Sequence, residues 1–279
     1  MESLGEKMSM GIPARIFATI LKYSPASVQN RLWKWWYQRI SKAHNKVDFR
    51  FMNYGFVDED GPVLDLVDEP YRLFIQLYHM NIRDVDLNNK QVLEVGSGRG
   101  GGASWIAKSK SPSSLIGVDF SKEAVTLCND WYEQENLNFI EGNAQDLPFD
   151  ADSFDIVYNV ESSHCYGDIN KFVSEVFRVL RKDGYFCWTD FRDEETMKKT
   201  EEIFQNVGFS VASKKEITDE VVDALDMIND AKKERITELV PRTIRRSFET
   251  FAGVQGTPVY DSFKSGKLKY YRYQMVKKN

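Results

Sequence analysis

The pattern of apolar and polar positions changes near residue 90 of the chain. Beyond this point, short apolar runs bounded by glycine, serine or aspartate alternate with segments that carry apolar residues three and four positions apart. The first pattern predicts buried strands, and the second predicts helices that bury one face. We expect strands at 91–95, 115–120, 137–140, 154–160, 185–191, 209–215 and 269–277. We expect helices at 102–109, 169–180 and 194–206, with a further helix capped by Ser121.

Strands that alternate with helices predict an α/β fold, in which a mostly parallel sheet carries helices on both faces. The terminal strand differs from the others because it follows the short turn Ser265-Gly266. A strand that returns through such a short turn would run antiparallel to its neighbour. The sequence therefore predicts one antiparallel strand at the C-terminal end of the sheet.

Two helical regions accompany this alternation. Residues 1–85 predict an N-terminal helical cap, with one helix at 28–40 and another at 69–81. Residues 86–279 then form the core domain. Within the core, the highly charged segment 218–251 interrupts the rhythm of strands and helices. We interpret this segment as a helical insertion before the last strand that contributes to a substrate cap.

Composition and charge limit the classes of protein to which this chain can belong. The chain has 279 residues, a hydrophobic fraction of 42% and a net charge of −5, which suit a folded α/β protein and give no case for nucleic-acid binding. Three scattered cysteines and three histidines show neither metal-ligand nor disulfide spacing. We therefore expect no metal site and a reducing, cytoplasmic location. No apolar stretch approaches the ~18 residues that a membrane-spanning helix needs.

The N-terminal region is basic and aromatic. Between Lys7 and Val47 there are eight basic residues and no acidic residue. Four aromatic residues lie in the same stretch: Trp33, Trp35, Trp36 and Tyr37. This combination suits a helix packed over the active site and equally suits peripheral contact with a lipid surface. A second basic cluster in the insertion is interpreted as a solvated helix face, with anionic-lipid contact as the alternative: Arg242, Arg245 and Arg246.

The strand at 91–95 runs directly into the glycine-rich turn 96–102. Glycines permit positive φ values and let a ligand approach the backbone closely. Asp119 ends the second strand, 25 residues after Glu94, where a carboxylate can accept hydrogen bonds from a ribose diol. Ligands of open α/β sheets bind beyond the carboxyl ends of the strands, so a nucleotide-type cofactor is predicted here. The turn also satisfies the dinucleotide pattern G-x-G-x-x-G and does not choose the cofactor alone.

Three features favour S-adenosylmethionine over a nicotinamide dinucleotide. Glu94 precedes the glycines, where a carboxylate would face a cationic ligand end and would repel a pyrophosphate. The segment 142–149 follows the third strand and is succeeded by 153–157. The chain also ends in a strand suited to antiparallel pairing.

At these residues the sequence resembles the class I S-adenosylmethionine-dependent methyltransferases. The resemblance implies a Rossmann-like, seven-stranded sheet of order 3-2-1-4-5-7-6. It also implies that the glycine turn flanks the methionine moiety, that Asp119 binds the ribose hydroxyls and that Tyr54 closes over the methionine part. Many relatives have aspartate where this chain has Asn143. The full expected cofactor-binding set is Glu94, Gly96, Ser97, Gly98, Asp119, Phe120, Asn143, Ala144, Asn159 and Tyr54.

Four segments resemble a narrower group, the phthiotriolone/phenolphthiotriolone dimycocerosate methyltransferases. They are 53–55, 100–104, 159–166 and 253–257. Members of this group O-methylate a hydroxyl on a long-chain polyketide lipid. The similarity implies a hydrophobic small-molecule substrate, without establishing that the substrate is the same.

Methyl transfer requires an acceptor atom aligned with the sulfonium methyl, and a hydroxyl acceptor benefits from losing its proton. His164 lies just beyond the fourth strand, and its ordinary pKa of ~6.5 suits proton abstraction at neutral pH. Asp190 ends the fifth strand, where it would orient His164 and stabilise the imidazolium. We predict His164 and Asp190 as the catalytic pair. The alternative is that His164 only packs under the cap and that positioning alone drives the reaction.

Two neighbours of His164 have open roles. Glu161 contacts either the cofactor amino group or a loop amide. Cys165 suggests a nucleophile, but methyl transfer needs no covalent enzyme intermediate.

The sequence therefore predicts an S-adenosylmethionine-dependent O-methyltransferase acting on a hydroxyl of a lipid-like or polyketide-like molecule. A C-methyltransferase acting on an isoprenoid or sterol-like acceptor is the alternative enzyme. A cofactor-binding scaffold without catalysis is the alternative from another class, although the intact Gly96, Gly98, Asp119 and His164 argue against it. The identity of the acceptor and the oligomeric state are not fixed by these patterns.

Overall fold

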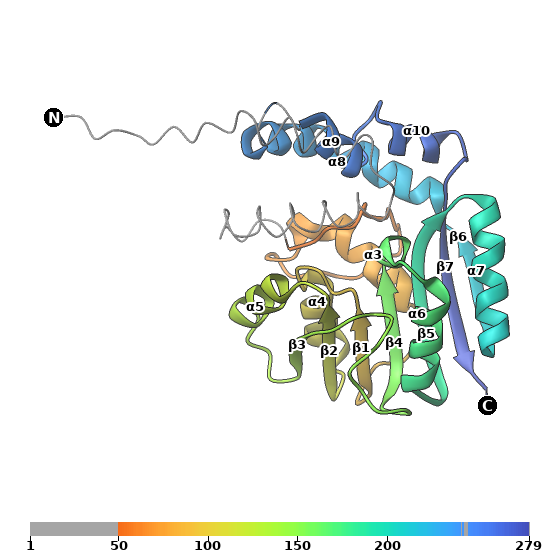
Figure 1. Ribbon diagram of the computed structural model, residues 1–279. Helices are drawn as coiled ribbons and strands as arrows, with labels where there is room; N and C mark the ends of the chain where they lie inside the picture. Colours follow the sequence, from red (N-terminus) through yellow and green to blue (C-terminus); the bar gives the residue numbers. More distant parts are fainter. Residues whose placement is uncertain (1–49, 241, 243–244, 279) are drawn as a thin grey trace.

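The alternating strands and helices form one seven-stranded sheet in the computed structural model, which describes residues 50–240, 242 and 245–278 (Figure 1). The predicted helix at 28–40 and the basic aromatic stretch lie outside the described residues. The strands are β1 (Gln91–Val95), β2 (Ser114–Asp119), β3 (Leu137–Glu141), β4 (Phe154–Val160), β5 (Leu180–Arg192), β6 (Phe209–Glu216) and β7 (Lys269–Lys277). The α-helices are α3 (Arg72–Ile82), α4 (Gly101–Lys110), α5 (Lys122–Trp131), α6 (Ile169–Val179), α7 (Glu194–Val207), α8 (Thr218–Leu239), α9 (Arg245–Phe251) and α10 (Pro258–Lys264). Two short 3-10 helices are η1 (Glu69–Tyr71) and η2 (Ser163–Cys165).

The strand order is β3-β2-β1-β4-β5-β7-β6, as the family resemblance implies. The five strands from β3 to β5 are mutually parallel, whereas β7 runs antiparallel to both β5 and β6. The predicted antiparallel C-terminal strand is thus confirmed. Its turn includes Gly266, whose φ of 71° is a conformation that glycine adopts at little cost.

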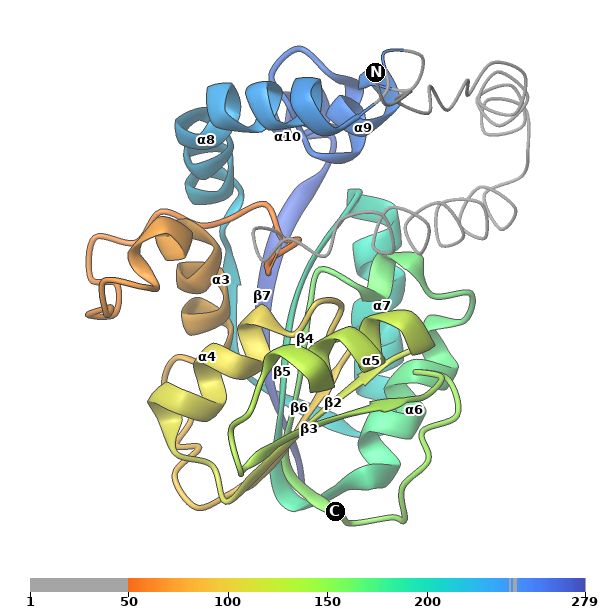
Figure 2. The same cartoon turned by 90° about the vertical axis from the view of Figure 1, so that its left-hand side faces the viewer.

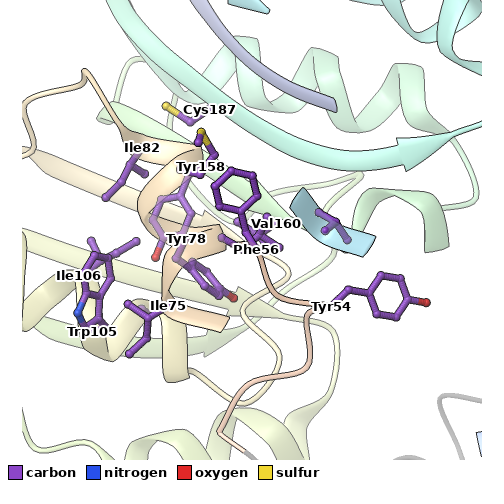
Figure 3. Packing of buried hydrophobic residues seen from close by; sticks show 14 of the residues in the cluster. Tyr54, Phe56, Ile75, Tyr78, Ile82, Trp105, Ile106, Tyr158, Val160 and Cys187 are labelled. Carbon is purple, nitrogen blue, oxygen red and sulfur yellow. The ribbon is translucent and has the colours of Figure 1, made fainter. Parts of the chain in front are cut away.

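Apolar side chains pack on both faces of the sheet. On the face covered by α3 and α4, one buried cluster includes Ile75, Ile106 and Tyr158, and Figure 3 shows this cluster from close by. On the face covered by α6 and α7, a second cluster includes Phe172 and Trp188. Figure 2 shows the two pairs of helices on opposite sides of the strands. Parallel strands covered on both faces read as continuous apolar runs, which explains the pattern in the sequence.

Some boundaries differ from the sequence-based expectation. Strand β5 begins at Leu180, earlier than the expected residue 185, because Leu180 pairs with Phe154 before an irregularity shifts the register. The expected helix at 69–81 is a 3-10 turn at η1 followed by α3. Helix α10 was not predicted from the sequence.

Helix α3 is fixed to the sheet by buried polar contacts with β7. Arg272 donates from Nε to the Met80 carbonyl at 3.1 Å and from Nη2 to the Arg83 carbonyl at 2.7 Å. Gln274 donates to the Asn81 carbonyl at 3.2 Å. These carbonyls belong to the last turn of α3 or follow it, where no further backbone donor of the helix is available. Strand β7 therefore caps α3 and sets its position over β4, β5 and β7.

Between β6 and β7 the chain forms α8, α9 and α10, which lie beyond the carboxyl ends of the parallel strands (Figure 1). The three arginines of this region do not share one helix face, contrary to our expectation. Arg242 precedes α9, while Arg245 donates to the carbonyls of Val240 and Thr237 and Arg246 donates to that of Gly256. Among the residues that the structure describes, no helix combines the length and apolar character needed to cross a membrane.

Candidate active site

The glycine turn after β1 adopts a conformation that other residues rarely adopt. Gly96 has a φ of 79° and Gly98 a φ of 55°. A Cβ atom on Gly96 would lie 2.3 Å from the Ser162 hydroxyl, so this position has no room for a side chain. Ser97 is buried, and its amide donates to the Val118 carbonyl at 3.0 Å. The turn therefore exposes backbone at the carboxyl edge of the sheet, where an open α/β sheet binds its ligand.

Asp119 is held beside this turn at the end of β2. Its Oδ2 accepts a hydrogen bond from the Gly98 amide at 2.9 Å, and its Oδ1 accepts one from the Ser121 amide at 2.8 Å. These bonds fix the carboxylate between the glycine turn and the start of α5. The next residue, Phe120, leaves 59% of its surface exposed, which is unusual for a large aromatic residue and suits a ring that stacks on a ligand.

The segment after β3 forms a tight turn. The Asn143 side chain is exposed, and its Oδ1 accepts a hydrogen bond from the Gln145 amide at 3.0 Å. Ala144 is partly buried against the α6 and α7 side of the core. The turn places the exposed Asn143 just beyond the carboxyl end of β3. The expected contact of these two residues with the cofactor stays a prediction.

Glu94 lies completely inside the protein. Its two carboxyl oxygens accept hydrogen bonds from the Tyr78 hydroxyl at 3.1 Å and the Tyr158 hydroxyl at 3.0 Å. Burial raises the pKa of Glu94 to about 8, and the two tyrosines only partly offset this effect. Helix α3 therefore supplies a second support for this carboxyl group, which the strand pattern alone does not reveal.

Asn159, in β4, is fully buried behind the glycine turn. Its side-chain amide donates to the Val95 carbonyl at 2.7 Å and to the Ser162 hydroxyl at 2.6 Å. The Ser162 side chain is also the one that leaves no space for a Cβ on Gly96. Asn159 thus fixes the end of β1 from behind, and a direct contact with the cofactor stays a prediction.

The structure brings His164 and Asp190 together at the ends of β4 and β5. The His164 Nδ1 lies 2.8 Å from the Asp190 Oδ1, and the His164 amide donates to the Asp190 Oδ2 at 2.9 Å. Asp190 is completely buried and also accepts a hydrogen bond from the Ser163 hydroxyl at 2.7 Å. Arg192 forms an ion pair with it at 3.2 Å. The Phe191 amide also donates to the Asp190 Oδ1, at 2.9 Å. A carboxylate fixed by His164, Ser163, Phe191 and Arg192 holds the imidazole in one orientation.

Charge determines the protonation of this pair. Burial alone would raise the pKa of Asp190, but the Arg192 guanidinium and His164 hold that pKa well below its usual range. Burial alone would lower the pKa of His164, but the Asp190 carboxylate outweighs burial and raises it to about 10. Because an ionised carboxylate only accepts hydrogen bonds, Nδ1 carries the proton. Nε2 is then the nitrogen that can gain or lose a proton.

Tyr54 connects the core to the helices beyond it. Its amide donates to the Glu161 Oε1 at 2.8 Å, and its hydroxyl donates to the Phe251 carbonyl at 2.9 Å. The ring packs against Phe191 of β5, with 5.8 Å between centroids, and the Lys232 ammonium of α8 lies 5.5 Å from its centre. Tyr54 is therefore largely enclosed, and the expected contact with the methionine part stays a prediction.

Comparisons with known proteins agree with this geometry. A methyltransferase domain family matches residues 93–188, from β1 to β5. The chain is 34% identical over 267 residues to a phthiotriol/phenolphthiotriol dimycocerosates methyltransferase of Mycobacterium tuberculosis, covering 95% of this chain and 98% of that protein. The chain belongs to this methyltransferase family. It is thus a class I S-adenosylmethionine-dependent methyltransferase.

Two further similarities place this methyltransferase among its relatives. It is 35% identical over 233 residues to a fatty-acid O-methyltransferase of Mycolicibacterium smegmatis, covering 82% of this chain and 84% of that protein. The crystal structure of geranyl diphosphate C-methyltransferase from Streptomyces coelicolor superimposes with a TM-score of 0.64 at 16% identity, covering 91% of this chain and 98% of that chain. At this low identity the second comparison supports the fold alone.

Several residues beside the candidate site were not found by sequence reasoning. The Arg50 carbonyl accepts a hydrogen bond from the Gly101 amide at 3.2 Å, and a Cβ on Gly98 would contact the Met52 sulfur at 3.4 Å. Ser163 lies between Asp190 and the Trp188 ring nitrogen, which donates to its hydroxyl at 2.8 Å. These contacts join residues far apart in the chain, so a local pattern does not indicate them.

Proposed function

We propose that this methyltransferase uses S-adenosylmethionine to O-methylate a hydroxyl on a lipid-like or polyketide-like acceptor, with His164 as the general base. The proposal rests on the 2.8 Å contact between His164 Nδ1 and Asp190 at the edge of the sheet that also carries the glycine turn. Relatives named for phthiotriol dimycocerosates and for fatty acids support a hydrophobic acceptor.

The residues present fit this cofactor. The positive φ values of Gly96 and Gly98 let a ligand lie against the backbone, and the fixed carboxylate of Asp119 suits a ribose diol. The exposed ring of Phe120 suits the flat face of an adenine. Glu94 is fully buried and bound by the hydroxyls of Tyr78 and Tyr158, so its expected contact with the cationic end of the cofactor stays a prediction. When bound, S-adenosylmethionine supplies an electrophilic methyl group on a sulfonium that is already a good leaving group.

His164, the proposed base, acts on the hydroxyl of the acceptor. The neutral His164 accepts the acceptor's hydroxyl proton at Nε2, while Asp190 holds Nδ1–H and stabilises the imidazolium that forms. In the unliganded site the raised pKa favours the imidazolium, which cannot accept a proton. A bound sulfonium would add a second positive charge to a site that holds protonated His164. The neutral imidazole would then be favoured, and His164 could accept the hydroxyl proton at Nε2.

A matched pair of histidine substitutions tests this function. His164→Gln keeps a polar side chain of similar reach but removes the base, so turnover on a hydroxylated lipid acceptor should fall by roughly 10²–10⁴-fold. His79→Gln is the control, because His79 lies on α3 beside Asp58 and Trp105. Calorimetry should show similar S-adenosylmethionine affinity for both variants. Equal turnover of the two variants would remove the base assignment.

The identity of the acceptor is tested separately. Lipid extracts incubated with the enzyme and S-adenosylmethionine should yield a product heavier by one methyl group, and mass fragmentation should place that group on oxygen. Placement on carbon would instead support a C-methyltransferase. Absence of binding to both S-adenosylmethionine and S-adenosylhomocysteine would contradict the cofactor proposal itself.

A further inference from the structure

Two hydroxyl groups lie directly against the glycine turn. A Cβ atom on Gly96 would lie 2.3 Å from the Ser162 Oγ and 2.7 Å from the Tyr166 Oη. Both side chains belong to the segment after β4, and both residues keep part of their surface exposed. We name Ser162 and Tyr166 the hydroxyl pair. The missing side chain at Gly96 therefore gives these two oxygens a place at the ligand edge of β1.

The hydroxyl pair lies between the two ends of the proposed reaction. Asp119, expected at the ribose, is the last residue of β2, and Asp190, which orients His164, lies near the end of β5. Strands β1 and β4 separate β2 from β5 in the sheet (Figure 1). The hydroxyl pair follows β4 and touches the turn that follows β1. A methyl group that passes from a cofactor beside Asp119 to an acceptor beside His164 therefore crosses the hydroxyl pair.

Hydrogen bonds fix the direction of each hydroxyl. The Asn159 side-chain amide donates to the Ser162 Oγ at 2.6 Å and to the Tyr166 Oη at 3.2 Å. The Ser162 hydroxyl donates to the Val95 carbonyl at 3.3 Å. The two hydroxyl oxygens lie 2.9 Å apart, so Tyr166 is the donor between them once the Ser162 proton is on Val95.

This arrangement leaves the two oxygens in different states. A hydroxyl oxygen has two lone pairs. Ser162 uses both, to accept from Asn159 and from Tyr166, whereas Tyr166 uses one, to accept from Asn159. Burial raises the pKa of Tyr166, and the charges of Asp119 and Asp190 add to this effect, so the phenol keeps its proton. Within the described part of the chain, the Tyr166 Oη thus keeps one lone pair without a donor.

An oxygen with a spare lone pair and a committed proton accepts only certain neighbours. It repels carboxylate and carbonyl oxygens and accepts from N–H, O–H or polarised C–H groups. The methyl group of a sulfonium carries part of the positive charge, so its C–H groups are good donors. The Tyr166 ring packs against Phe172 of α6, with 4.9 Å between ring centroids. The oxygen is therefore held at one position, as in-line transfer requires.

We propose that the Tyr166 Oη accepts C–H···O contacts from the sulfonium methyl of the cofactor and holds that methyl in line with an acceptor at His164. The proposal rests on the proposed function, because a sulfonium cofactor is what brings such a methyl group to this edge. Ser162 and Asn159 act through Tyr166 and are positioning residues. Ser162 takes the Tyr166 proton, and Asn159 occupies the other lone pair.

Calorimetry with S-adenosylmethionine and S-adenosylhomocysteine tests the contact, because the two ligands differ by the methyl group and its charge. Tyr166→Phe keeps the ring and removes the oxygen. Its S-adenosylmethionine affinity should fall about fivefold, since C–H···O contacts are weak, and its S-adenosylhomocysteine affinity should stay within about twofold of the wild type. Tyr132→Phe is the matched control, because the Tyr132 hydroxyl donates to the Arg99 carbonyl of the same glycine turn at 3.0 Å. It should change both affinities by the same factor.

Ser162→Ala is a second variant, which leaves Tyr166 in place. The Tyr166 hydroxyl then lacks Ser162 as the acceptor of its proton, and this proton can turn toward the sulfonium. The preference for S-adenosylmethionine over S-adenosylhomocysteine should therefore fall in this variant too. In nuclear magnetic resonance, the methyl proton signal of bound, isotope-labelled S-adenosylmethionine should move upfield in Tyr166→Phe and stay in place in Tyr132→Phe, since a C–H···O contact deshields the hydrogen.

Two results would overturn the contact. One is an equal loss of affinity for both ligands in Tyr166→Phe and Ser162→Ala, which would show that the hydroxyl pair only supports the turn. The other is an unchanged affinity for S-adenosylmethionine. Melting temperatures report whether the variants fold, and Ser162→Ala decides the question if Tyr166→Phe does not. These measurements involve neither the acceptor nor His164, so they leave the base assignment in place. A wild-type chain that binds neither ligand would instead contradict the cofactor proposal and the contact together.

Discussion

At the scale of single residues, the site depends on carboxyl groups whose surroundings differ. Asp119 and Asp190 accept hydrogen bonds from backbone amides, and Asp190 also has an adjacent guanidinium. Glu94 is fully buried and accepts hydrogen bonds from two tyrosine hydroxyls. Burial outweighs these bonds and raises its pKa to about 8. Glu94 and Asp190 thus differ in charge near neutral pH. Arg192 and His164 keep Asp190 ionised, so that His164 has an anionic partner.

The charge of Asp190 predicts a pH dependence. Only neutral His164 can accept a proton, and Asp190 raises the pKa of His164 above its ordinary ~6.5. We expect kcat/KM for S-adenosylmethionine, which reports the enzyme before the cofactor binds, to rise with pH through that raised pKa. The same shift means that the ion pair stabilises the fold fully below pH ~6.5 and loses this effect as pH rises through the folded-state pKa. Measuring kcat/KM from acid to alkaline pH checks the direction.

The variant Asp190→Asn tests the cause of this dependence. The asparagine oxygen can still accept from Nδ1–H, but the negative charge is lost. The rise in kcat/KM should therefore move to lower pH, while its plateau falls because the imidazolium is less stabilised. Because Arg192 loses its anionic partner, melting temperature and cofactor affinity need to be measured alongside. A midpoint identical to that of the wild type would contradict the proposed coupling.

At the scale of elements, the glycine turn shows why backbone conformation and space both matter. Gly96 and Gly256 have similar φ values of 79° and 73°. A Cβ on Gly96 would lie 2.3 Å from the Ser162 hydroxyl, whereas nothing lies within 4 Å of a Cβ on Gly256. Alanine at either position has the same backbone strain, of roughly 1–2 kcal/mol. Only at Gly96 is there an added clash at the ligand edge.

These two positions make a matched pair. We expect Gly256→Ala to lower the free energy of unfolding by about 1 kcal/mol and to leave cofactor affinity unchanged. Gly96→Ala should lower the free energy of unfolding by more than this. Its S-adenosylmethionine affinity should fall at least tenfold, because Ser162 and the turn must shift. Chemical denaturation and calorimetry on both variants measure the two effects. Comparable cofactor affinity in the two variants would mean that the close approach at Gly96 is not used.

Element boundaries also show how far the sequence can be interpreted. The strands flanked by glycine or aspartate were placed closely, since apolar runs of that length have few alternatives. The start of β5 was missed because residues 181–183 carry no apolar pattern. The register with β4 passes over them, from Leu180 to Tyr185. Helix α10 was missed because seven residues give barely two turns of periodicity.

At the scale of the whole molecule, the candidate site combines predictable and unpredictable parts. His164 and Asp190 were expected to meet because the carboxyl ends of adjacent parallel strands share one edge. The contacts of Tyr54 with Glu161 and Phe251 span 107 and 197 residues of sequence. Nothing in a local pattern indicates such distant partners. The segments 53–55 and 253–257 entered only through the family resemblance, and the structure shows that they meet at Tyr54.

Tyr54 is the residue through which the helices beyond the sheet are fixed to the core. Its hydroxyl donates to the Phe251 carbonyl at the end of α9, while its amide is bound to Glu161. The side chain of Lys232, on α8, covers its ring and donates to the Ala252 carbonyl at 3.0 Å. Removing the Tyr54 hydroxyl should therefore weaken the attachment of α8 and α9 to the core and leave the sheet unchanged.

The variant Tyr54→Phe removes one hydrogen bond and keeps the ring. We expect a loss of about 1 kcal/mol in the free energy of unfolding and faster amide exchange in 248–256, with exchange in β1 and β4 unchanged. The acceptor KM should rise more than the cofactor Kd, since α8–α10 lie beyond the strand ends while the glycine turn belongs to the core. Tyr185→Phe, at the opposite end of β5, is the control. An equal rise of amide exchange in β1 would mean that Tyr54 supports the fold as a whole. A rise confined to 248–256 would mean that the helices beyond the sheet open separately from the cofactor-binding core, and that Tyr54 restrains this opening.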